Sequence, residues 1–183
     1  PLPQASLQLV YPGVERDDPG FFAAFLMNHV LGGGTFSSRL FDEVREKRGL
    51  AYGVGSSLIT GDHADMLMIG TSTRADRAQE ALGVIRDVVG DVAANGITEE
   101  ELARAKTYLV GAYPINNLDS STAVARTLLE LQKDGRGIDY IERRVGLIEA
   151  VTLDEVREAA ARLLTAEPAV LVIGPEAGDG NGG

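Results

Sequence analysis

The chain has 183 residues, of which 44% are hydrophobic and 24% charged, values typical of one globular domain. A formal net charge of -10 argues against a nucleic-acid-binding protein, because binding to phosphates needs a basic surface. The absence of cysteine excludes disulfide bonds and thiolate metal sites. No apolar run approaches the roughly 20 residues that a membrane-spanning helix needs, so no membrane span is expected.

The N-terminal half is predicted to form three strands and three helices. Asp18 can cap a helix that has Pro19 in its first turn, and Gly32 is expected to stop that helix. Ser37 or Ser38 can cap the next helix. The predicted elements are a strand over residues 5–11, helices over about 19–31 and 38–47, a hairpin of strands over about 50–60 and 64–73, and a helix over about 75–94.

The C-terminal half is predicted to be helical until a last strand. Thr98–Glu101 and Thr152–Glu155 have the spacing of capping boxes, so a helix should start at each. Pro114 is expected to end or kink the first of these helices, and Asp119 to cap the next one. The predicted elements are helices over about 99–113, from 119, over 138–150 and over 152–164, and a buried strand over 169–173.

This order of elements predicts an α+β fold. Neighbouring antiparallel strands come early, a helical block then covers one side of the sheet, and the last strand returns to the sheet from far along the chain. We expect one domain over residues 1–175 and a flexible glycine-rich tail over residues 176–183. Because the chain begins with Pro1 rather than Met, we expect a fragment or a processed product.

Residues 31–54, LGGGTFSSRLFDEVREKRGLAYGV, contain the strongest functional signal. Here a glycine loop precedes a short helix, and the helix leads into a strand, so Arg45 and Tyr52 are predicted to lie in the same neighbourhood. The guanidinium of an arginine can grip carbonyl or carboxylate oxygens, and a tyrosine hydroxyl can donate to a developing oxyanion. The alternative is an Arg45–Asp42 ion pair on an exposed helix face, with Tyr52 packed in the sheet.

Other residues of this segment have ordinary explanations. Arg39 lies four residues before Glu43, as in a helix-surface ion pair, and Arg48 complements the dipole at the helix end. The glycine loop of Gly32, Gly33 and Gly34 lacks the spacing of nucleotide-binding loops and follows a helix rather than a strand. A helix stop with close backbone packing explains this loop at least as well as a role in binding.

The two histidines do not form a recognisable metal site. His29 lies on an apolar helix face, which is typical of a core or boundary histidine, and His63 lies in a predicted loop beside Asp62 and Asp65. A weak cation site at that loop is less favoured than a solvated turn. We therefore expect no metal or other cofactor to be bound by this chain.

The segment 31–54 resembles the signature of the second, inactive domain of the M16 zinc metallopeptidases, the relatives of pitrilysin, insulysin and mitochondrial processing peptidase. In that family an arginine and a tyrosine at this spacing hold peptide near the zinc, a role that the resemblance assigns to Arg45 and Tyr52. The corresponding loop is glycine-rich in the family, with a longer insertion in the processing peptidases. The zinc-binding His-x-x-Glu-His helix of the family has no counterpart in this chain.

The resemblance implies a domain that grips a peptide or unfolded protein substrate while another domain or subunit holds zinc. We therefore do not expect the isolated chain to be catalytic. The alternative is a non-catalytic scaffold or binding protein of the same fold, since some family members are scaffolds. The implied partner is a zinc-binding M16 N-terminal domain or subunit, and a homodimer is left open. Bacterial relatives favour a periplasmic over a cytoplasmic location, although the residues do not determine the compartment.

Overall fold

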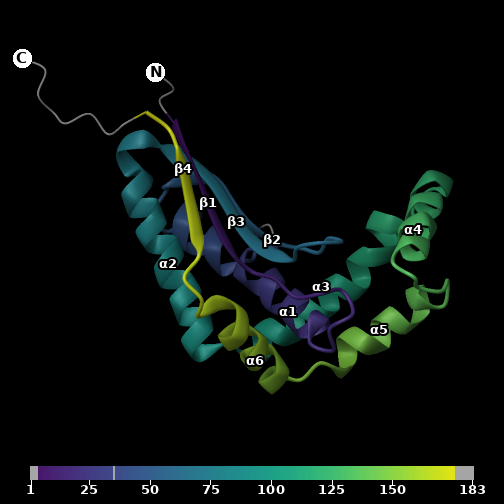
Figure 1. Ribbon diagram of the computed structural model, residues 1–183. Coiled ribbons are helices and arrows are strands. Elements are labelled where there is room, and N and C mark those ends of the chain that lie inside the picture. The colour runs from purple at the N-terminus through teal and green to yellow at the C-terminus, as the bar shows by residue number, and fades with distance from the viewer. Residues whose placement is uncertain (1–3, 35, 176–183) are drawn as a thin grey trace, which may run out of the picture.

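The computed structural model describes residues 4–34 and 36–175, and its centre is a four-stranded sheet (Figure 1). The strands are β1 (Gln4–Pro12), β2 (Ala51–Ile59), β3 (Met66–Arg74) and β4 (Ala169–Ile173). Their order is β2-β3-β1-β4, and all neighbouring strands are antiparallel. This sheet confirms the predicted α+β class. The expected tail, residues 176–183, lies outside the described residues.

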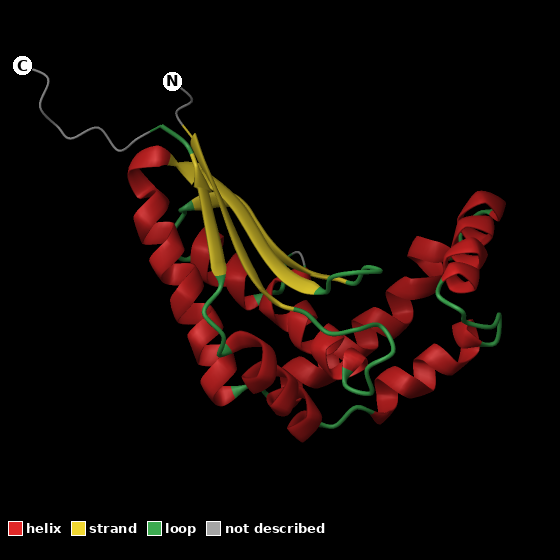
Figure 2. Ribbon diagram, in the orientation of Figure 1, coloured by secondary structure: helices red, strands yellow, loops and turns green. Residues whose placement is uncertain are grey.

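The helices lie against one face of the sheet, and none of the helices in the described part of the chain lies on the opposite face (Figure 2). Helices α3, α4 and α5 continue beyond the end of the sheet as an arm (Figure 1). The helices are α1 (Phe21–Asn28), α2 (Ala78–Asn95), α3 (Glu99–Asn117), α4 (Ser121–Lys133), α5 (Tyr140–Ala150) and α6 (Leu153–Leu164), with wide π-type turns at η1 (His29–Gly33) and η2 (Phe41–Glu46) and a 3-10 turn at η3 (Ala75–Arg77).

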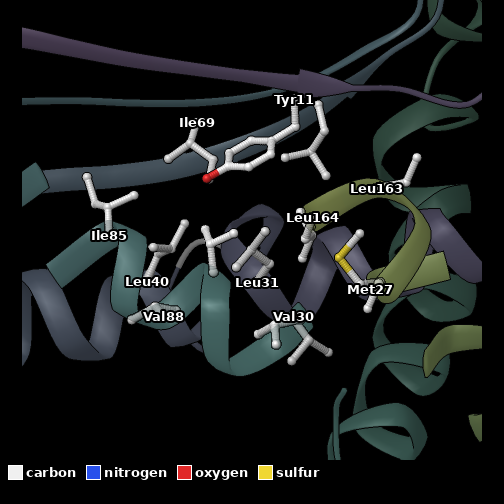
Figure 3. Close-up of a cluster of buried hydrophobic side chains, with 14 of the residues drawn as sticks. Tyr11, Met27, Val30, Leu31, Leu40, Ile69, Ile85, Val88, Leu163 and Leu164 are labelled. Atoms are coloured by element: carbon white, nitrogen blue, oxygen red, sulfur yellow. The ribbon is translucent and has the colours of Figure 1, made fainter. Parts of the chain in front are cut away.

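The core fills the space between the sheet and these helices. Burial alternates along β1 and β3, so that one side of each strand faces the helices and the other faces away. Tyr11 and Ile69 come from the sheet, Leu31 and Ile85 from the helical layer, and Leu164 from α6 (Figure 3). Burying a side chain of this kind stabilises the fold by about 1.5–3 kcal/mol relative to leaving it exposed. The packing of these residues therefore holds the sheet and the helices together.

Several helix ends differ from the prediction. The first helix begins at Phe21 rather than Pro19, because the Asp18 carboxylate accepts the Gly20 N–H at 2.7 Å and forms a tight turn before it. Pro114 does not end α3, which continues to Asn117. The side chain that caps α4 belongs to Ser120 rather than Asp119.

Both predicted capping boxes are confirmed. Thr98 accepts a hydrogen bond from the Glu101 N–H, and Thr152 accepts one from the Glu155 N–H. Each glutamate also accepts the backbone N–H of its threonine, so the box satisfies two helix-end donors. Among the described residues, no helix has the length and apolar character needed to cross a membrane.

The last strand is not buried, contrary to prediction. β4 pairs with β1 alone and forms an edge of the sheet, and all five of its residues are exposed. Val170, Leu171, Val172 and Ile173 retain between 37% and 61% of their accessible surface. A compact apolar run is typical of a strand that is covered on both faces, but an edge position leaves its outer side open.

Candidate functional site

The glycine loop is placed by close packing against β2. A Cβ atom on Gly32 would lie 2.6 Å from the backbone nitrogen and the Oγ of Ser56, closer than real Cβ contacts allow. Ser56 Oγ also donates a hydrogen bond to Asn28 Oδ1 at 2.7 Å. On Gly34, an added Cβ would lie 3.0 Å from the imidazole of His29. Close packing therefore explains why these positions are glycines, in agreement with the interpretation of this loop as a helix stop with close backbone packing.

Tyr52 lies in a β-bulge that turns its side chain outward. The pairing of β2 with β3 shifts between Ala51 and Val54, and the Tyr52 side chain in this irregularity is 88% exposed. The displaced carbonyl groups of the bulge are bound by threonines of β3. Thr71 Oγ1 donates to the Gly53 carbonyl oxygen at 2.7 Å, and Thr73 Oγ1 donates to the Leu50 carbonyl oxygen at 2.5 Å. These threonines are positioning residues that sequence reasoning missed.

Arg45 lies against the same bulge from the η2 helix. Its guanidinium carbon is 4.8 Å from the ring centroid of Phe41 and 4.9 Å from that of Tyr52, so the cation contacts two aromatic rings. The Arg45 Nε atom is 3.6 Å from a carboxylate oxygen of Glu46, at the exposed end of the helix. Asp42 instead pairs with Lys47 at 2.8 Å.

The structure thus brings Arg45 and Tyr52 together, as predicted from the helix-to-strand geometry. The alternative fails on both counts, because Arg45 does not pair with Asp42 and Tyr52 does not pack within the sheet. The two side chains form a cation-aromatic pair, in which Tyr52 is exposed and the Arg45 side chain keeps 32% of its accessible surface.

An aromatic residue extends this pair towards the glycine loop. The Phe36 ring lies edge-on to Phe41, with 5.3 Å between ring centroids, and Phe36 is 77% exposed. Phe36, Phe41, Arg45 and Tyr52 contact one another in turn, and we call these four residues the clamp strip; Phe41 is buried, so it supports Phe36 and Arg45 from within the fold. Sequence reasoning did not select Phe36, although its place two residues after the glycine loop was the available signal.

A shallow pocket of about 480 Å³ adjoins the clamp strip at Tyr52. It lies over β1, β2 and β3, and its lining includes Gly53 and Gly70 together with Ser6, Gln8 and Ser72. Sequence reasoning also missed this pocket, which forms only where three separate strands are aligned.

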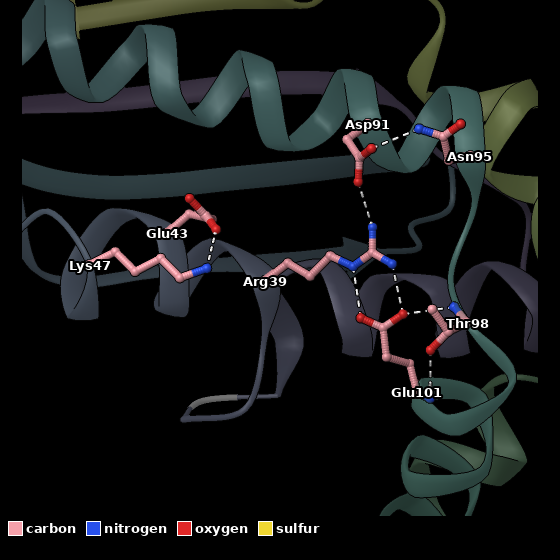
Figure 4. Close-up of polar contacts among 7 residues, drawn as sticks. All are labelled: Arg39, Glu43, Lys47, Asp91, Asn95, Thr98 and Glu101. Atoms are coloured by element: carbon pink, nitrogen blue, oxygen red, sulfur yellow. Dashed lines mark hydrogen bonds and ion pairs between the residues drawn. The ribbon is translucent and has the colours of Figure 1, made fainter.

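Arg39 joins three helical segments instead of pairing with Glu43 as predicted (Figure 4). Its guanidinium donates to both carboxylate oxygens of Glu101, at 2.8 and 2.7 Å, and to Asp91 at 2.8 Å. Glu43 pairs with Lys47 and Arg48. Arg48 also donates to the Glu43 carbonyl oxygen at 2.9 Å, at the end of the helix where a cation was expected. These contacts hold the helices that support the clamp strip.

The histidines lie apart and do not suit zinc. His29 stacks on Tyr108 with 5.0 Å between ring centroids, and burial lowers the pKa of its imidazole, which favours the neutral form. His63 is exposed in the loop between β2 and β3. Within residues 4–34 and 36–175, no group of three His, Cys, Asp or Glu side chains is arranged to hold a metal ion. The residues described therefore do not fit the zinc site of a metallopeptidase.

Comparison with known proteins gives consistent results. The family described as "Peptidase M16 inactive domain" matches residues 1–109. An uncharacterized zinc protease of Streptomyces coelicolor is 36% identical over 174 residues, which cover 94% of this chain and 37% of the relative. The crystal structure of a peptidase M16 inactive domain from Pseudomonas fluorescens superposes with a TM-score of 0.84 at 33% identity, over 94% of this chain and 40% of that one.

One relative has a different description. A protein of Helicobacter pylori, described as a non-peptidase homolog, is 26% identical over 133 residues, which cover 73% of this chain and 30% of the relative. In each of these three comparisons the chain spans no more than about two fifths of the protein that it matches.

Proposed function

The chain belongs to the M16 peptidase family, within which it matches the inactive domain, and from this premise we propose that it grips a peptide substrate for a zinc centre held by another domain or subunit. The observation that carries the proposal is the contact between Arg45 and Tyr52, at 4.9 Å, on an exposed surface. The substrate would be a peptide or an unfolded protein, whose extended backbone offers carbonyl oxygens to both groups.

Each residue of the pair would have a separate part in this grip. Arg45 is held against two rings, so its planar fork is oriented before a peptide arrives and less side-chain entropy is lost on binding. Its N–H groups would donate to backbone carbonyl oxygens, and the Tyr52 hydroxyl would donate to the oxygen on which charge develops. Zinc in the other domain would supply an activated water. The contribution of this chain would be to orient the scissile bond and to stabilise charge.

The proposal requires a partner that supplies the metal. The chain spans 37% of the Streptomyces zinc protease, so that relative has ample further sequence for a zinc-binding domain. For this protein, a His-x-x-Glu-His helix in the same gene would indicate one self-contained protease chain. The same helix in a neighbouring gene would indicate a two-subunit enzyme.

Substitution of the pair tests the proposal in the complex of this chain with its zinc-binding domain or subunit. We expect Arg45→Ala and Tyr52→Phe each to lower kcat/KM for an internally quenched peptide by about 10²-fold, as the loss of one oxyanion donor does. Zinc content and melting temperature should stay unchanged, because both side chains lie at the surface. Arg104→Ala, in an exposed ion pair on α3, is the matched control. Turnover near the wild-type value in both variants would reject the role.

The second candidate function is a non-catalytic scaffold or binding protein, which the Helicobacter pylori homolog favours because it is described as a non-peptidase. A scaffold could keep the Arg45–Tyr52 pair for binding alone. Peptide binding without any hydrolysis by the intact protein, with zinc supplied, would support this candidate over the first.

A further inference from the structure

The pocket beside Tyr52 has a floor of backbone because two glycines lie beneath it. A Cβ atom added to Gly53 or Gly70 would meet no atom within 4 Å, so no neighbouring group requires glycine at either position. Gly70 pairs with Gln8 of β1 and with Gly55 of β2, so Gln8 is the only one of these three paired positions that has a side chain. The helices cover the opposite face of the sheet (Figure 2). Neither packing nor backbone strain therefore accounts for the glycine floor.

The walls of the pocket are polar and neutral. Ser6 and Ser72 lie directly opposite each other, with 3.3 Å between their hydroxyl oxygens, and Gln8 contributes an amide. None of the described residues that line the pocket carries a charge, in a chain whose formal net charge is -10. Hydroxyl and amide groups both donate and accept hydrogen bonds, so they suit peptide groups and neutral polar side chains. A basic side chain would lose hydration there without an acidic partner, and the Arg45 guanidinium beside Tyr52 would repel it.

Tyr52 belongs to both the clamp strip and the pocket. Its ring lies against the guanidinium of Arg45, and its side chain also lines the pocket. An extended peptide advances about 3.3 Å per residue, so a chain held at Arg45 reaches the pocket within a few residues. The two features therefore form one continuous surface.

We propose that this pocket is a second peptide subsite, which takes an extended, neutral polar stretch of substrate next to the residue gripped by Arg45 and Tyr52. The inference rests on the proposed function, because it takes the ligand of the clamp strip to be a peptide. It adds a preference that the clamp strip does not provide: the subsite would favour small side chains and side chains with amide or hydroxyl groups, and it would exclude basic ones.

Backbone amide NMR of the 183-residue chain tests the subsite, with the blocked peptide acetyl-Ala-Gln-Ser-Gln-Ala-amide as the probe. We expect saturable shifts at the amides of Gly53, Gly70 and Ser72. Gly70→Val should weaken binding by about tenfold or more, since valine suits a strand and its side chain fills the floor of the pocket. Ser57→Val, exposed on β2 and outside the pocket lining, should leave the affinity unchanged.

A second peptide with lysine in place of each glutamine tests the charge selectivity, and we expect it to bind about tenfold more weakly. No saturable shift with the neutral peptide at millimolar concentration, or shifts that survive Gly70→Val, would overturn the subsite. Equal affinity for the two peptides would overturn the stated ligand class. If the titration fails while Arg45→Ala still impairs turnover, the subsite alone is wrong. If the titration succeeds while Arg45→Ala and Tyr52→Phe leave turnover unchanged, the proposed function is wrong and peptide binding stands.

Discussion

Arg39 illustrates at the residue scale how a half-buried charge is satisfied. Four residues along the helix, Glu43 offers a half-buried partner, and such a pair on one helix contributes only a few tenths of a kcal/mol. Glu101 is fixed in the first turn of α3 by its capping box, so both of its carboxylate oxygens face Arg39 (Figure 4). A two-point contact with a pre-oriented carboxylate outcompetes the local pair.

Arg39→Met should reduce the free energy of unfolding by roughly 1–3 kcal/mol at neutral pH, because it removes charged hydrogen bonds that are partly shielded from water. Arg104→Met, whose pair with Glu100 is exposed on both sides, is the matched control and should cost less than about 1 kcal/mol. Urea denaturation measures both. Equal losses in the two variants would contradict the assignment of Arg39 as a link between helices.

The same pair gives a pH dependence. Burial raises the pKa of Glu101, but the hydrogen bonds from Arg39 and then from Thr98 outweigh it, so the net pKa is below its ordinary value. The carboxylate therefore stabilises the fold above its unfolded pKa of about 4.3, and this contribution is lost as the pH falls through the lower folded value. The difference in the free energy of unfolding between wild type and Arg39→Met should therefore become smaller as the pH falls through that range.

The bulge in β2 shows at the element scale how the sheet presents Tyr52. A regular strand would alternate its side chains, whereas the bulge leaves both Tyr52 and Gly53 exposed. Thr71 and Thr73 point to the helix-facing side and hold the displaced carbonyl groups from β3. The position of the candidate site therefore depends on a neighbouring strand.

Thr71→Val should destabilise the chain by about 1–3 kcal/mol, because the Gly53 carbonyl oxygen loses its bond while the volume of the side chain is kept. It should also increase hydrogen exchange along the bulge at residues 51–54, where the loosened backbone opens more often. Thr60→Val, at an exposed position between β2 and β3, should change neither quantity. Unaltered exchange at the bulge in Thr71→Val would show that the hydroxyl does not hold it.

Local signals predicted the elements well where the partner groups are close in sequence. The capping boxes at Thr98 and Thr152 and the contact of Arg45 with Tyr52 depend on a few residues of separation, and each was correctly predicted. The Arg39–Glu101 link and the pocket depend on segments brought together by the fold, so residue spacing could not predict them. Burial of β4 was predicted wrongly because an apolar run does not reveal which strand lies at the edge.

In the molecule as a whole, helices cover the two faces of the sheet unequally. The helices lie on one face of the sheet and β4 forms an edge (Figures 1 and 2), while the pocket beside Tyr52 lies over β1, β2 and β3. Within the described part of the chain, no strand pairs with the outer side of β4. An apolar edge strand is a template for pairing with another chain, and soluble proteins normally blunt such edges with charge or cover them.

This geometry predicts that the separate chain self-associates through β4. In a dilution series followed by sedimentation velocity, wild type should shift from a larger species to monomer, and Val172→Lys should remain monomeric throughout, because a charged side chain at an edge opposes strand pairing. Leu147→Lys removes a similarly exposed apolar side chain from α5 and should associate like wild type. Equal association of wild type and Val172→Lys would place the contact elsewhere. A monomeric wild type at every concentration would contradict self-association through β4.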